Sequence, residues 1–165
     1  MMGVFDRMVE GMNRAVGIVI IACYAALLAD VAAGTVSRFV HAPIVWSEEL
    51  ARDLFVWITV LAAGRGVAKN VHIGVDFFVH AAPRKLQDVL AVASYVGVAI
   101  LAIVLIVTGL QLSSFGLRSR SMLLDIPMAY LYFAVPAGAF VILMNTLHQL
   151  AQVLRRSMTG AVEPL

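Results

Sequence analysis

The stretch from Trp46 to Arg65 reads W-S-E-E-L-A-R-D-L-F-V-W-I-T-V-L-A-A-G-R, and it decides how the chain folds. As an α-helix it is about 28 Å long, close to the roughly 30 Å hydrocarbon thickness of a bilayer. Only Leu54 to Gly64 is free of charge. The first two turns therefore bring charged side chains to the edge of the hydrocarbon, where an unpaired charge is costly. We expect a transmembrane helix over 47–69 whose charged end needs partners.

The charged end of this helix carries three acids and one base. Glu48 and Glu49 lie one helical turn before Arg52 and can pair with it along the helix, and Asp53 follows directly. One arginine cannot neutralise three carboxylates. The surplus negative charge must reach water, Arg38 across the short preceding connection, or a second polypeptide. We expect the loss of Arg52 to do more damage than the loss of either glutamate alone, because it leaves the acids unpaired.

The composition is that of an integral membrane protein. Of the 165 residues, 62% are hydrophobic and 13% are charged, whereas soluble domains have about 45–50% and 25%. No basic patch with interleaved aromatic residues indicates nucleic-acid binding, and the single cysteine, Cys23, excludes an internal disulfide. The sequence has no nucleophile–base arrangement, no glycine-rich phosphate loop and no zinc-protease motif. We therefore expect no enzymatic activity and no cofactor.

The apolar runs predict an all-α membrane protein with a single domain over residues 1–165 and four transmembrane helices. Besides the helix over 47–69, the expected spans cover about 15–36, 89–110 and 127–150. Arginines precede the first apolar run, as in a signal peptide, but an acid interrupts the run and no clear cleavage site follows. We interpret this run as an uncleaved first span.

The first span combines small residues with one acid. Ala25, Ala29 and Ala33 recur every four residues and would let another helix approach closely; the alternative is alanine that faces lipid. Asp30 is either a proton relay or a structural partner. Its structural partner would be Arg38, two helical turns on, or a polar group on a neighbouring helix.

Residues 70–87 connect the second and third spans. His72, Asp76 and His80 recur every four residues opposite apolar positions, which predicts an amphipathic helix in the membrane interface. The same residues also alternate with period two, so an extended segment stays possible. Three such side chains on one helical face could ligate a metal ion. We favour a solvated helical face and no metal site.

The fourth span contains two prolines and a polar end. Pro127 stands in its first turn, where proline is tolerated, and Pro136 should kink the helix. The other end carries four polar side chains: Asn145, His148, Gln149 and Gln152. These side chains either form a polar path or lie at the depth of the lipid headgroups.

Four groups of residues follow one another between about residue 38 and residue 138. They are Arg38-Phe39; Trp46-Ser47-Glu48-Glu49-Leu50-Ala51-Arg52; His72-Ile73-Gly74-Val75-Asp76 with Pro83; and Ile126-Pro127, Tyr130, Tyr132 and Pro136-Ala137-Gly138. In this order they resemble the small membrane subunit of tripartite ATP-independent periplasmic (TRAP) transporters, the DctQ family. The second group is fairly specific, and the other groups are weak when taken alone.

The resemblance implies a division of labour. In such systems a periplasmic substrate-binding protein captures an organic acid, and a large multi-span subunit, DctM-like, carries it inward with sodium. The small subunit binds the large one as a fixed, non-catalytic scaffold in the lipids of the bacterial inner membrane. A second hypothesis from the residues alone is a small homo-oligomeric transporter or channel that uses Asp30.

Two sets of residues are candidates for these roles. The first is a charge cluster for a subunit interface or for structure: Asp30, Arg38, Trp46, Glu48, Glu49, Arg52 and Asp53. The second is the motif of the fourth span: Pro127, Tyr130, Pro136 and Gly138.

Lysine and arginine placement predicts the orientation. Eight basic residues lie near the chain ends or between the second and third spans: Arg7, Arg14, Arg65, Lys69, Arg84, Lys85, Arg155 and Arg156. Four lie at the other two connections: Arg38, Arg52, Arg118 and Arg120. Because basic residues are enriched on the cytoplasmic side, we expect both termini in the cytoplasm and the Trp46 end outside.

This orientation can be tested by labelling single cysteines in intact cells. In a Cys23→Ala background, cysteines at His41 and Ser119 should react with an impermeant maleimide added outside, and a cysteine at Ser157 should not. Labelling at position 157 with none at the other two positions would reverse the orientation.

Overall fold

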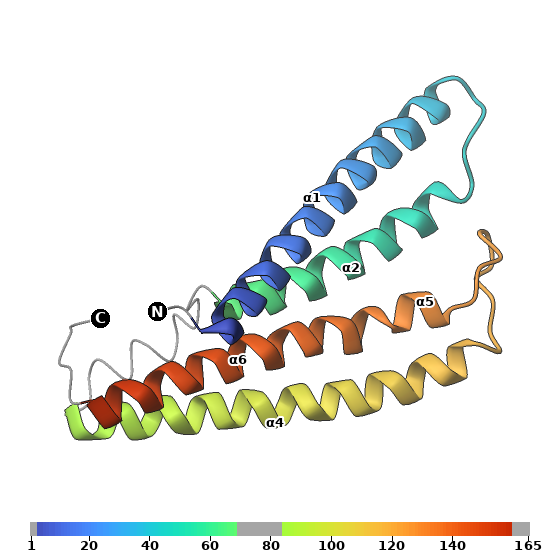
Figure 1. The fold of residues 1–165 in the computed structure, drawn as a ribbon. Helices are drawn as coiled ribbons and strands as arrows, with labels where there is room; N and C mark the ends of the chain where they lie inside the picture. Colours follow the sequence, from blue (N-terminus) through green and yellow to red (C-terminus); the bar gives the residue numbers. More distant parts are fainter. Residues whose placement is uncertain (1–2, 69–83, 160–165) are drawn as a thin grey trace.

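The computed structural model describes residues 3–68 and 84–159, and in these ranges all named elements are α-helices. They are α1 (Val4–Phe39), α2 (Ser47–Ala68), α4 (Arg84–Gly116), α5 (Ala129–Tyr132) and α6 (Ala134–Thr159) (Figure 1). The predicted all-α class is confirmed. The interfacial residues His72, Asp76 and His80 lie outside the described residues.

Three helical stretches are long and apolar enough to cross a membrane: Val4–Phe39, Val92–Gly116 and Ala129–Val153. The last of these stretches runs through α5 and most of α6. The helix α2 has 22 residues, which is sufficient length. It is not among the three because charged residues occupy its first two turns and Arg65 lies near its end.

The long helices form a row in the order α1, α2, α6 and α4, and the N-terminal part of α1 also contacts α6. The helix α2 packs against α1 on one side and α6 on the other, and α6 also packs against α4. In the described part of the chain, α4 touches neither α1 nor α2. Figure 1 shows α2 and α6 between the outer helices, with the α1–α2 and α4–α5 connections at one end. We call this the outer end, after the predicted orientation, and the opposite end the inner end.

The α2–α6 crossing in the middle of the row depends on two glycines. A Cβ atom added to Gly138 would lie 2.8 Å from the carbonyl oxygen of Val60, and one added to Gly64 would lie 2.9 Å from side-chain atoms of Val141. Both distances are too short for a real Cβ, so only glycine lets the two backbones approach this closely. Gly138 was predicted as part of the fourth-span motif, and this contact gives it a packing role.

The fourth predicted span is interrupted near Pro136. The helix α5 ends at Tyr132 and α6 begins at Ala134, and proline has no N–H to donate to the carbonyl four residues earlier. The interruption falls at Phe133, three residues before the proline, where the backbone keeps right-handed helical dihedrals, so α5 and α6 continue as one stretch and the expected kink stays a prediction. The ring of Pro136 also lies against α4, because a Cβ at Gly109 would be 2.7 Å from its Cδ atom. Pro127 precedes α5, and its carbonyl accepts the N–H of Tyr130 at 3.2 Å.

Replacing Gly138 with alanine should destabilise the fold. The new methyl group meets the backbone of Val60, which cannot move aside as a flexible side chain can, so we expect a loss of about 1–3 kcal/mol. Thermal unfolding of the detergent-solubilised chain measures the effect. Gly97→Ala in α4 is the matched control: no atom lies within 4 Å of its Cβ position, and alanine favours the helix. A Gly138→Ala variant as stable as Gly97→Ala would rule out the close crossing.

Candidate functional site

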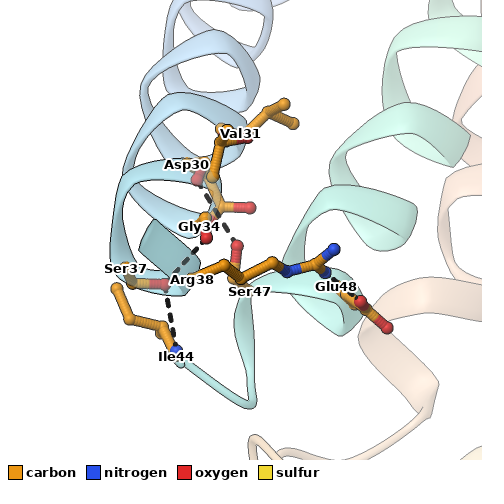
Figure 2. Close-up of polar contacts among 9 residues, drawn as sticks. Asp30, Val31, Gly34, Ser37, Arg38, Ile44, Ser47 and Glu48 are labelled. Carbon is orange, nitrogen blue, oxygen red and sulfur yellow. Dashed lines mark hydrogen bonds and ion pairs between the residues drawn. The ribbon is translucent and has the colours of Figure 1, made fainter. Parts of the chain in front are cut away.

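The connection between α1 and α2 is held by backbone hydrogen bonds and by one serine. The N–H groups of His41 and Ala42 donate to the carbonyls of Arg38 and Ser37, at 3.2 and 3.0 Å, in the pattern that commonly ends a helix. His41 takes the left-handed conformation that this ending needs, with φ of 56°. The Ser37 hydroxyl donates to the Gly34 carbonyl and accepts the N–H of Ile44 (Figure 2). These hydrogen bonds hold the α1–α2 connection, which we call the corner, in one conformation.

A second serine joins the two helices at this corner. Ser47, which could have capped α2, donates its hydroxyl instead to the backbone carbonyl of Asp30 in α1, at 3.4 Å. A Cβ atom at Gly34 would lie 2.6 Å from the Ser47 hydroxyl oxygen. The absence of a side chain at Gly34 therefore lets the start of α2 lie directly against α1.

The Asp30 carboxylate is enclosed in this corner. The residue is only 9% exposed, and its Oδ2 atom has no hydrogen-bond partner among the described residues. The pair that we considered between Asp30 and Arg38 is wrong, because Arg38 forms an ion pair with Glu48 of α2. The pairing of Arg38 with one of the surplus acids across the short connection was expected. Both side chains of this Arg38–Glu48 pair are exposed.

Glu49 points to the other side of α2 and holds the connection between α4 and α5. One carboxylate oxygen accepts the backbone N–H groups of Leu123 and Leu124, at 2.9 and 3.1 Å. Glu49 is 7% exposed. A buried carboxylate with two backbone donors and a nearby arginine is well satisfied. Glu49 is therefore a structural link between the two halves of the row.

Arg52 contacts acids of its own helix. Its guanidinium lies 3.3 Å from the second carboxylate oxygen of Glu49 and 3.6 Å from Asp53. The predicted pair with Glu49 is present, whereas Glu48 pairs with Arg38 instead. The Arg52 side chain is 58% exposed. Leu123 and Leu124 also bind Glu49, so Glu49 does not depend on Arg52 alone. We therefore expect replacement of Glu49, and not of Arg52, to cause the greatest loss of stability.

The other predicted residues lie on open surfaces. Ala25, Ala29 and Ala33 are exposed on α1, so this repeat does not form the α1–α2 contact. Trp46 and Tyr130 lie near the outer end. Their exposed fractions are 45% and 66%. These surfaces are free to meet lipid or another polypeptide.

The inner end contains a polar cluster that sequence reasoning did not assign to structure. The Asn145 side chain is 1% exposed. Its amide donates to the Gly64 carbonyl of α2 at 2.9 Å and exchanges hydrogen bonds with Asn13 of α1 at 2.7 and 3.1 Å. One turn on, Gln149 donates to the Val67 carbonyl. Asn145 and Gln149 thus bind neighbouring helices, and their position at headgroup depth stays a prediction.

The arrangement indicates interaction rather than catalysis. In the described ranges no group of three or more histidine, cysteine, aspartate or glutamate side chains is placed to hold a metal ion. At the outer end, the charges hold helices and connections together. His148 lies 2.8 Å from Asp6 of α1 at the inner end, which is a further link between helices.

Comparison with known families and proteins gives a consistent result. The family described as "Tripartite ATP-independent periplasmic transporters, DctQ component" matches residues 27–156. The sialic acid TRAP transporter permease protein SiaT of Haemophilus influenzae is 38% identical over 72 residues, which are 43% of this chain and 11% of that protein.

Two small permease proteins are also similar. The C4-dicarboxylate TRAP transporter protein DctQ of Rhodobacter capsulatus is 30% identical over 102 residues, 58% of this chain and 43% of that protein. The sialic acid TRAP transporter protein SiaQ of Vibrio cholerae is 23% identical over 113 residues, 68% and 65%. The chain thus covers less than two thirds of each relative. These relatives are transporter permeases, which confirms that the chain is not an enzyme.

Substitution of the two adjacent glutamates should separate the buried link from the exposed ion pair. Glu49→Gln removes the charge from the side chain that accepts the N–H groups of Leu123 and Leu124, and a hydrogen bond to a charged group is stronger than one to a neutral group. Glu48→Gln removes one partner of an exposed pair, worth under about 1 kcal/mol. Thermal unfolding in detergent should show a clearly larger loss for Glu49→Gln. Equal losses for the two variants would contradict the structural role of Glu49.

Proposed function

The chain belongs to the DctQ component family of tripartite ATP-independent periplasmic transporters, and we propose that it scaffolds a larger, substrate-translocating membrane subunit. On this proposal the larger subunit carries the organic acid and sodium, and a periplasmic binding protein delivers the substrate. The small subunit holds the larger one in place and catalyses no step.

The observation that carries this proposal is the open row of helices. A transporter that moves a substrate needs a site enclosed between helices near the middle of the membrane. Among the described helices, α4 contacts only α5 and α6, and α1 contacts α6 only beside its contact with α2, so the helices follow one another in an open arrangement. Large apolar side chains are exposed along α1 and α4, including Ile21, Leu28, Ile100 and Val104. Such faces suit lipid and a permanent protein partner.

Four membrane crossings fit the same arrangement. The helix α2 lies between two helices that are apolar enough to cross, and its charged end is bound by Arg38 and by the α4–α5 connection. Those partners lower the cost of placing the charges of its outer end near the hydrocarbon. We infer four spans in a bacterial inner membrane with both termini in the cytoplasm.

The position of Asp30 argues against the homo-oligomeric transporter or channel. Asp30 is buried on the face of α1 that meets α2, beside Ser47. A relay shared between copies would need the carboxylate on a free face of the row. Mass measurement of the solubilised complex distinguishes the two functions, because the scaffold requires a much larger membrane protein in the same particle.

Bulky residues in the alanine repeat should weaken binding to the larger subunit. Ala25 and Ala29 are exposed in this chain, so leucine at either position leaves the α1–α2 contact intact but overpacks a close interface, at a cost of about 1–3 kcal/mol. Co-purification with the larger subunit measures the effect, and the unfolding temperature of the isolated chain is the control. If both variants co-purify at the wild-type yield, the interface lies on another face.

A further inference from the structure

A groove of about 370 Å³ lies at the inner end, beside α1 and α2. Its polar lining includes Arg14 of α1, Arg65 of α2 and one acid, Glu10. A neighbouring hollow of about 230 Å³ shares Glu10 and Arg14 and adds Arg7. Three arginines and one glutamate therefore line the two hollows, which carry a net positive charge.

The two arginines of the groove are unused by the fold. Within residues 3–68 and 84–159, neither Arg14 nor Arg65 forms an ion pair or a side-chain hydrogen bond. Arg65 nevertheless has a defined place: a Cβ atom at Gly17 would lie 2.5 Å from its Nη1 atom. The guanidinium thus lies over the bare backbone of α1, on the side of the groove. Cationic groups placed without protein partners are available to an anion.

The apolar lining of the groove indicates a second property of the anion that would bind there. Ile18 and Ile21 follow Arg14 by four and seven residues, so all three lie on one face of α1. The two isoleucines are 63% and 68% exposed. The isoleucines thus extend this face of α1 from Arg14 into the uncharged stretch of the first predicted span. A molecule that fits both parts has an anionic head and an apolar tail in one line.

We propose that this groove binds an anionic phospholipid, with its phosphate between Arg14 and Arg65 and an acyl chain along Ile18 and Ile21. The planar guanidinium group matches phosphate oxygens in paired hydrogen bonds. Basic pockets between helices on the cytoplasmic side bind lipid headgroups of this kind. The alternative occupant is a partner protein that brings a carboxylate to the arginines and apolar side chains to the isoleucines.

Native mass spectrometry of the full chain, with any membrane protein that co-purifies, tests this proposal. The probes are phosphatidylglycerol, zwitterionic phosphatidylcholine with the same acyl chains, and soluble glycerol phosphate. The wild type should retain phosphatidylglycerol in preference to phosphatidylcholine. Arg14→Gln and Arg65→Gln should each weaken its binding roughly fivefold, since a basic residue near an anionic lipid surface contributes about 1 kcal/mol. Glu10→Gln should strengthen binding, because it removes the one acid.

Arg118→Gln is the matched control, since it removes the same charge from an exposed position at the outer end. Equal weakening by Arg118→Gln and Arg65→Gln would overturn the site in favour of general charge attraction. Displacement of the lipid by glycerol phosphate would assign the groove to a free phosphate compound and overturn the lipid. If the arginine variants lose the co-purifying protein but keep the lipid preference, the groove is a protein interface and the proposal fails.

Discussion

The charges in the first two turns of α2 are the constraint on which the arrangement of the other helices depends. Carboxylates at the edge of the hydrocarbon need cations or N–H donors within reach. The fold supplies them from both sides, since α1 contributes Arg38 to Glu48 and the α4–α5 connection contributes two N–H groups to Glu49. Only a helix between α1 and the α4–α5 connection can receive both. The central place of α2 in the row therefore follows from its charge.

The inner end of α2 is held by a different chemistry. The glycines at the α2–α6 crossing bring the backbones close, and this proximity lets amide side chains of α6 reach carbonyl groups of α2. Asn145 and Gln149 are neutral, so they can be buried here at far lower cost than an ion. An interhelical hydrogen bond of this type contributes modestly in a membrane, about 0.6 kcal/mol on average. Its main effect is to fix the register and rotation of one helix against the other.

Sequence reasoning predicted the helices because apolar runs and prolines are local signals. It also predicted the Arg52–Glu49 pair, since three residues along a helix bring the side chains together. It could not predict that Glu49 binds Leu123 and Leu124, because any backbone N–H in a loop is a possible donor and the sequence carries no mark of it. Which of two adjacent glutamates is buried depends on helix rotation, and tertiary packing sets that rotation.

The partners of the alanine repeat in α1 and of the polar residues in α6 also depend on tertiary packing. The repeat of Ala25, Ala29 and Ala33 predicts a face that permits close approach, but a repeat does not say which helix approaches, and among the described residues the three alanines are exposed. The polar residues of α6 were visible in the sequence as a group. Two of their partners are backbone carbonyls of α2, which every residue carries, so the sequence shows no sign of these helix contacts.

A flat row of helices has a physical justification in a membrane that it would lack in water. Apolar faces gain little by meeting each other in lipid, because the lipid tails are as apolar as the side chains. Nothing therefore forces the four helices to close into a bundle. Their order is set instead by a few specific contacts: the carboxylate at the outer end, the glycine crossing and the amides at the inner end. These contacts fix α2 and α6 against each other while both broad faces stay open. On the scaffold proposal, the open apolar faces are the surfaces that would meet the larger membrane protein.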